Sequence, residues 1–207
     1  FKHMIHDSGM AFVILMHLDP NHKGSIAQLL QNYTLMPVVE ATDGMPIEPD
    51  KVYIIPPNAD MGIHNRKLLL LKPGKVSGFS MPIDYFLQSL AEDQWNKAVA
   101  IIFSGMGSDG ETGVRMVKEK LGMAMAQDPE TAWYPSMPTS AIETNLIDYV
   151  IAPEEMPRKL IQYMNHPVIA EDANEEAINE IKNSNAFQKV LMLLRSQTGH
   201  DFSLYKK

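Results

Sequence analysis

The sequence contains no cysteine among its 207 residues. This absence excludes a disulfide framework, a thiolate metal site and a cysteine nucleophile. The chain also contains no run of about 18 apolar residues, which a membrane-spanning helix would need, so we expect no membrane insertion. A chain without disulfides is compatible with a reducing compartment, and we expect a cytoplasmic location.

Basic residues are scarce relative to acidic ones, because 18 Lys and Arg stand against 25 Asp and Glu and give a net charge of -7. A nucleic-acid-binding protein usually presents a basic face, so we expect no nucleic-acid partner. Hydrophobic residues make up 45% of the chain and charged residues 21%, which is ordinary for a soluble globular protein. A chain of this length can enclose one sizeable core, or one domain with part of another.

Short apolar runs alternate with amphipathic segments along most of the chain. The apolar runs predict strands at residues 11–16, 38–41, 52–55, 98–103, 122–128 and 148–151. The amphipathic segments predict helices at residues 25–33, 81–93, 111–122, 137–145 and 153–164, and a hairpin at 61–71 is compatible with the pattern. This alternation predicts an α/β fold with a mainly parallel sheet and helices on both faces. In such folds the active groups lie at the carboxyl ends of the strands.

A single carboxylate, Asp109, lies in the glycine-rich stretch FSGMGSDGETG that follows the most apolar predicted strand. One interpretation is that Asp109 caps the helix that begins near Glu111. The other is a functional acid, with the amides of Gly105, Met106 and Gly107 available to donate hydrogen bonds to a developing anion. A phosphate-binding loop is a rival interpretation of the glycine spacing, but an acid within it would repel phosphate.

His17 follows the predicted strand at 11–16 and should lie at the same sheet edge as Asp109. Histidine suits proton transfer near neutral pH, so the pair predicts the base and the acid of a hydrolytic triad. His17 and His22, with Asp19 between them, are an alternative metal site, but a convincing third ligand is lacking. We therefore predict no metal and no cofactor.

The nucleophile of such a triad is missing from the sequence. No serine lies in a G-x-S-x-G pattern, and Ser104 is better interpreted as a hydroxyl at a strand end. A triad whose residues follow one another along the chain as His, Asp and Ser is found on an all-β fold, which this chain does not have. The remaining order places the serine ahead of Phe1.

Four segments in order resemble the catalytic domain of the chemotaxis protein-glutamate methylesterases (CheB). They are VILMHLDPNH, EATDGMPIEPDKVYIIPPN, FSGMGSDGETG and AQDPETAWYPSMPTSAIETNLIDYVIAPEEMP. The resemblance covers residues 1–164, which we expect to be the catalytic domain. The acidic composition of residues 165–185 predicts a linker, and residues 186–207 resemble the start of a chemotaxis methyltransferase (CheR). The whole suggests part of a bacterial methylesterase–methyltransferase fusion protein.

The resemblance implies a three-layer α/β/α fold and a serine hydrolase that removes methyl esters from glutamates on chemoreceptor helices, or deamidates glutamines there. It implies His17 as the triad histidine, Asp109 as the triad acid and the Met106 backbone as part of the oxyanion site. The family's nucleophile lies in a Gly-Ala-Ser-(Ala/Thr)-Gly-Gly turn after the first strand, which should lie shortly before Phe1. Met16 occupies a position that is often Gln in the family, and phosphorylation control is not expected because no receiver domain is present.

Three expectations follow for the chain as given. It should be inactive as an esterase, and the truncated first strand should leave an open sheet edge that favours self-association or instability. Its expected partners are methylated cytoplasmic helices of chemoreceptors and the adjoining methyltransferase domain. The alternatives are a non-catalytic receptor-docking or regulatory module, a nucleotide-binding domain and another type of serine hydrolase.

Overall fold

The computed structural model describes residues 1–16, 26–72 and 81–165. The first parallel sheet has the strand order β1-β3-β2, with Phe12 and Val38 both opposite Val52. Its members are β1 (Phe12–Ile14), β2 (Val38–Glu40) and β3 (Val52–Ile54). All three residues of the central strand β3 are buried, as expected for an apolar run between two neighbours.

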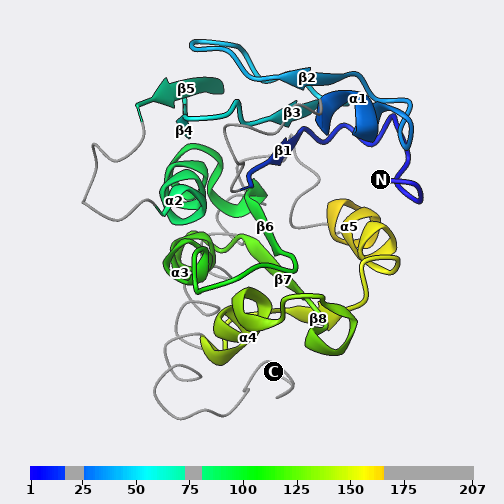
Figure 1. The fold of residues 1–207 in the computed structure, drawn as a ribbon, viewed down its shortest axis with the longest axis vertical. Helices are drawn as coiled ribbons and strands as arrows, with labels where there is room; N and C mark the ends of the chain where they lie inside the picture. Colours follow the sequence, from blue (N-terminus) through cyan, green and yellow to red (C-terminus); the bar gives the residue numbers. More distant parts are fainter. Residues whose placement is uncertain (17–25, 73–80, 166–207) are drawn as a thin grey trace, which may run out of the picture.

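A second parallel sheet has the order β6-β7-β8 and lies below the first in Figure 1. It is formed by β6 (Val99–Ile102), β7 (Met123–Gln127) and β8 (Tyr149–Ile151). The predicted hairpin is confirmed as an antiparallel pair, β4 (Asp60–His64) and β5 (Lys67–Leu71). Asn65 and Arg66 connect them with positive φ angles of 50° and 58°, the backbone of the two-residue turns that hairpins prefer.

Helices cover both faces of the second sheet (Figure 1). On one side lie α2 (Pro82–Gln94), α3 (Glu111–Glu119) and α4 (Ser136–Glu143), and on the other lies α5 (Met156–Met164). The shorter elements are α1 (Ile26–Gln31) and two 3-10 turns, η1 (Trp95–Lys97) and η2 (Pro129–Thr131). The helix expected to end at Gly122 ends earlier, at Glu119, and Leu121 rather than the glycine takes the left-handed conformation with φ 66°.

The apolar core is divided by the second sheet. Residues of β6 alternate between its faces, because Ala100 and Ile102 pack with α2 and α3 whereas Val99 and Ile101 pack on the α5 side. The α5 side is rich in methionine, whose flexible side chain fills irregular gaps. The methionines in or against that cluster are Met4, Met10, Met123, Met125 and Met156.

A large cleft separates the two parallel sheets. Within the described parts of the chain, β1 pairs only with β3 and β6 pairs only with β7, so each has one unpaired edge. Residues of both strands line a cavity of about 1610 Å³, together with apolar side chains of α2 and α5. The three residues of β1 are only partly buried although all are apolar. The predicted mainly parallel α/β architecture is therefore confirmed as two parallel half-sheets with a cleft between them.

None of the helices in the described ranges combines the length and the apolar character needed to cross a bilayer.

The Tyr163 hydroxyl joins α5 to η1, the turn that follows α2, by donating a hydrogen bond to the carbonyl oxygen of Asn96 at 3.0 Å. Burial, assisted by the negative charge of Asp148, raises the pKa of Tyr163 to about 12. An unfolded tyrosine ionises near pH 10, so between about pH 10 and 12 the unfolded state loses a proton that the folded state keeps. The free energy of unfolding should therefore fall as the pH rises through this window.

We expect a Tyr163→Phe variant to lose less stability than the wild type between about pH 9 and pH 11, because it lacks this proton linkage. Urea unfolding of both proteins at the two pH values measures the difference, and the other tyrosines contribute equally to both. Two proteins that lose stability in parallel would contradict the expectation.

Candidate active site

The carboxylate of Asp109 lies in the loop that follows β6, and the side chain is only 6% exposed. Its Oδ2 accepts a hydrogen bond from the amide of Ile83 at 3.1 Å, and its Oδ1 accepts one from the amide of Asp84 at 2.9 Å. Pro82 begins α2 and has no N–H, so Asp109 satisfies the next two amides of that helix. The interpretation of Asp109 as a cap of its own following helix is therefore wrong, because it caps α2, about 25 residues earlier in the chain.

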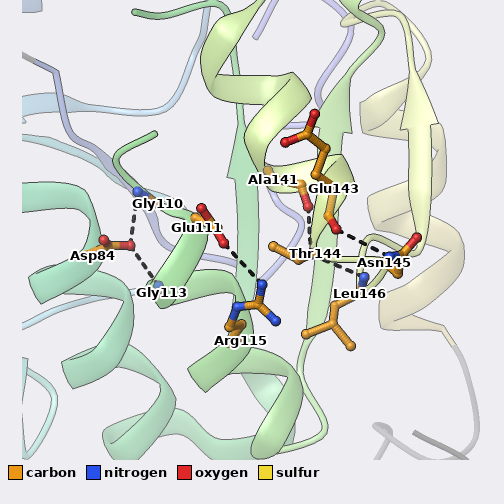
Figure 2. A network of polar contacts seen from close by, with 10 residues as sticks. All are labelled: Asp84, Gly110, Glu111, Gly113, Arg115, Ala141, Glu143, Thr144, Asn145 and Leu146. Atoms are coloured by element: carbon orange, nitrogen blue, oxygen red, sulfur yellow. Dashed lines mark hydrogen bonds and ion pairs between the residues drawn. The ribbon is translucent and has the colours of Figure 1, made fainter. Parts of the chain in front are cut away.

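Asp84 makes the reciprocal interaction, which the sequence did not reveal. Its Oδ1 accepts hydrogen bonds from the amides of Gly110 at 3.0 Å and Gly113 at 2.7 Å, at the start of α3 (Figure 2). Burial raises the pKa of Asp84 above its ordinary value, and the negative charge of Asp109 adds to this rise, whereas the amides of Gly113 and Gly110 lower it. The sequence offered one signal for Asp84, because it is an acid in the first turn of a helix that begins with proline. That position predicts an interaction with the dipole of its own helix, and not with the start of α3.

Two of the three loop amides proposed to bind an anion are already engaged. The amide of Gly105 donates to the carbonyl oxygen of Tyr134 at 2.9 Å, and the amide of Gly107 donates to Oγ of Ser136 at 3.0 Å. The Met106 amide has no acceptor within the described residues, and the Met106 side chain is 73% exposed beside the cleft. Of these three amides, that of Met106 is therefore the one that remains able to donate within the described part of the chain.

Ser104 is fixed in a structural network, as its interpretation as a strand-end hydroxyl predicts. Its amide donates to Oε1 of Gln127 at 2.9 Å, and its Oγ accepts from the amide of Tyr134 at 2.9 Å. Gln127 is buried and donates to the carbonyl oxygen of Thr131 at 3.0 Å. These bonds hold the loops after β6 and β7 against each other, which positions Met106.

His17 lies outside the described residues, as do Asp19 and His22 of the alternative metal site. Met16, the residue before His17, follows β1 and lines the same cleft as Met106. Within residues 1–16, 26–72 and 81–165, no group of three or more histidine or carboxylate side chains is arranged to hold a metal ion.

Residues 1–160 match the family model described as CheB methylesterase. The chain belongs to the CheB methylesterase family. The crystal structure of the Thermotoga maritima CheB methylesterase catalytic domain is similar to this structure with a TM-score of 0.71 and 33% sequence identity. That similarity covers 78% of this chain and 87% of the solved one, and it confirms the fold.

The curated relatives include a named protein-glutamate methylesterase and an uncharacterized protein. A Thermotoga maritima protein named protein-glutamate methylesterase/protein-glutamine glutaminase is 34% identical over 154 residues, which are 72% of this chain and 45% of the relative. An uncharacterized 104.1 kDa protein of Rhodobacter capsulatus is 40% identical over 139 residues, which are 67% of this chain and 14% of the relative. The chain therefore spans less than half the length of these two relatives.

Proposed function

We propose that the polypeptide containing this chain is a serine-type protein-glutamate methylesterase of chemotaxis-type signalling. It hydrolyses glutamyl methyl esters on cytoplasmic chemoreceptor helices and shares glutamine deamidation with its named relatives. Membership of the CheB methylesterase family supports the reaction class. The observation that carries the proposal is the buried Asp109 carboxylate, held by two α2 amides in the loop that also contains Met106.

The proposed mechanism uses an acyl-enzyme. A serine upstream of Phe1 attacks the ester carbonyl while His17 accepts its proton, and His17 then donates that proton to the leaving methoxide, which departs as methanol. Water, activated by the same imidazole, hydrolyses the acyl-enzyme to glutamate and free serine. Asp109 orients the ring and stabilises its cation, and the Met106 amide donates to the oxyanion.

The cleft between β1 and β6 supports the upstream position of the nucleophile. Each of these strands has an edge without a strand partner in the described chain, and the cleft is lined by apolar residues such as Phe12, Ile14 and Ile101. Parallel neighbours in one sheet lie about 4.8 Å apart, so a strand in the cleft would join the half-sheets. A serine at the carboxyl end of that strand would lie near Met16 and Met106.

Methanol release from a methylated receptor tests the proposal. We compare this chain with a polypeptide extended upstream by about 25 residues, roughly a strand, a turn and the start of a helix. Release by the extended form alone is expected, because loss of the nucleophile removes nearly all the benefit of a triad. The shorter form should also self-associate in gel filtration, since its sheet edges stay open. No release by either form would refute the enzymatic proposal.

A receptor-docking or regulatory module is the second candidate function. It is favoured by exposed apolar side chains on the loops after β6 and β7: Phe103, Tyr134 and Trp133, the last of which is 91% exposed. Residues 186–207 would then begin an adjoining methyltransferase domain after the acidic linker at 165–185. A catalytically silent extended polypeptide that still binds receptor helices would favour this candidate over the esterase.

A further inference from the structure

The first turns of α2 and α3 are each capped by a carboxylate that comes from the other helix or from the residue just before it. Neither helix has a side-chain hydrogen bond from its own N-cap residue, which is Met81 in α2 and Gly110 in α3. Asp109, which precedes α3, accepts the first available amides of α2, and Asp84, in the first turn of α2, accepts amides of α3. The start of each helix therefore depends on a carboxylate from the other.

We propose that Asp84 is a positioning residue that holds the Asp109 carboxylate in its working orientation. The catalytic consequence rests on the proposed function, whereas the effect on Asp109 itself does not. Asp84 binds Asp109 through its backbone amide, and it binds Gly110, the next residue in the chain, through its side-chain carboxylate. Its backbone amide donates to Asp109 Oδ1 at 2.9 Å, and its own Oδ1 accepts from the Gly110 amide at 3.0 Å. These bonds close a ring around Asp109 (Figure 2 shows the Gly110 side).

The ring of hydrogen bonds requires a backbone conformation at position 110 that only glycine adopts readily. Gly110 has a φ of 103°, in the region that residues with a Cβ avoid. A Cβ there would also lie 2.7 Å from Cδ1 of Ile102 and 3.2 Å from Cγ2 of Ile83. A third hydrogen bond, from the amide of Gly113 to Oδ1 of Asp84 at 2.7 Å, fixes the first turn of α3 to the same carboxylate.

No other described side chain replaces the Asp84 carboxylate at this helix start. Glu111, the first residue of α3, forms an exposed ion pair with Arg115 at 3.0 Å on the outer surface (Figure 2). Removal of the Asp84 carboxylate thus leaves the Gly110 and Gly113 amides without that acceptor, and the loop after Asp109 can relax. A misplacement of about 1 Å in a catalytic group lowers turnover by about 10²-fold.

The test uses three variants of the full-length polypeptide. Asp84→Ala removes the acceptor, whereas Asp84→Asn keeps a side-chain oxygen at the same place and is an equally good capping residue. Asp148→Ala is the matched control. Asp148 accepts from the amide of Ala124 at 2.8 Å and from Nζ of Lys118 at 2.7 Å, close to the C-terminal end of α3 rather than its start.

We expect Asp84→Ala to lower kcat for methanol release by about 10²-fold with KM unchanged, and Asp84→Asn to keep most of the activity. Asp148→Ala should lose stability but retain kcat. Amide hydrogen exchange gives a readout that needs no activity. The amides at positions 83 and 84, which donate to Asp109, should exchange faster in Asp84→Ala alone.

Unchanged exchange at these two positions in Asp84→Ala would overturn the proposal, as would an Asp84→Asn variant as impaired as Asp84→Ala. A fall in kcat of the same size in Asp148→Ala would also overturn it, because general loss of stability would then explain the result. If the wild-type polypeptide releases no methanol, the proposed function fails, and the exchange rates alone decide whether Asp84 holds Asp109.

Discussion

Replacement of Asp109 by Ala is expected to lower kcat for methanol release by about 10⁴-fold in the polypeptide extended to include the proposed upstream nucleophile. Without the carboxylate, the imidazole of His17 loses the group proposed to fix its tautomer and stabilise its cation. The amides of Ile83 and Asp84 also lose their acceptor in a buried position. The free energy of unfolding should therefore fall by about 1–3 kcal/mol.

Asp128 offers a matched control for the Asp109 substitution. It follows β7, the strand next to β6, and its Oδ1 accepts from the amide of Glu130 at 3.0 Å at the start of η2. Asp128→Ala should lower the free energy of unfolding by about 1 kcal/mol and leave methanol release unchanged. If the two variants lost the same activity, Asp109 would be a helix cap without a catalytic role.

Gly113→Ala should lower the stability of the protein by overpacking the contact between α2 and α3. The added Cβ would lie 2.5 Å from Cβ and 2.8 Å from Cδ1 of Leu87, which is buried on α2. A Cβ so close to another Cβ cannot be relieved by rotation of a side chain, so the helices must separate. Overpacking of this kind lowers the free energy of unfolding by about 1–3 kcal/mol, and we expect the upper end.

Gly44→Ala is the comparison for Gly113→Ala. Nothing lies within 4 Å of a Cβ built at Gly44, although its φ of 74° strains any alanine there. That strain lowers the free energy of unfolding by about 1–2 kcal/mol, without moving α2 or α3. Urea unfolding measures both losses. A Gly113→Ala variant as stable as the wild type would contradict the close helix packing.

The sequence was sufficient to predict most strands and helices, because their patterns are local. The apolar run at 98–103 became β6, and the segment at 81–93 became α2, displaced by one residue at each end. The end of α3 was not predictable in the same way. A glycine at 122 suggested a terminating residue, but Leu121 adopts the left-handed conformation instead.

The site was less predictable because its hydrogen bonds join distant segments. The residue type of Asp109 suggested a cap, yet the amide that it accepts from belongs to Ile83 in the first turn of α2, 26 residues earlier. The role of Asp84 depends on the packing of α2 against α3, which no local pattern encodes. The glycine-rich loop suggested three amide donors, and only the folded contacts with Tyr134 and Ser136 distinguish Met106 from its neighbours. The role of His17 stays a prediction.

The division into two half-sheets has a consequence for folding kinetics. The strands β1, β2 and β3 come from one contiguous stretch of chain, and β6, β7 and β8 come from another. Each half-sheet can therefore assemble through contacts of moderate sequence separation. Helix α2 packs on β4 of the hairpin and on α3, and α3 packs on β6 and β7, so α2 connects the hairpin to the second half-sheet. Docking of the two halves joins segments that lie farther apart in the sequence than any strand pair within a half, so we expect docking to be the slow step, during which exposed apolar surface favours aggregation.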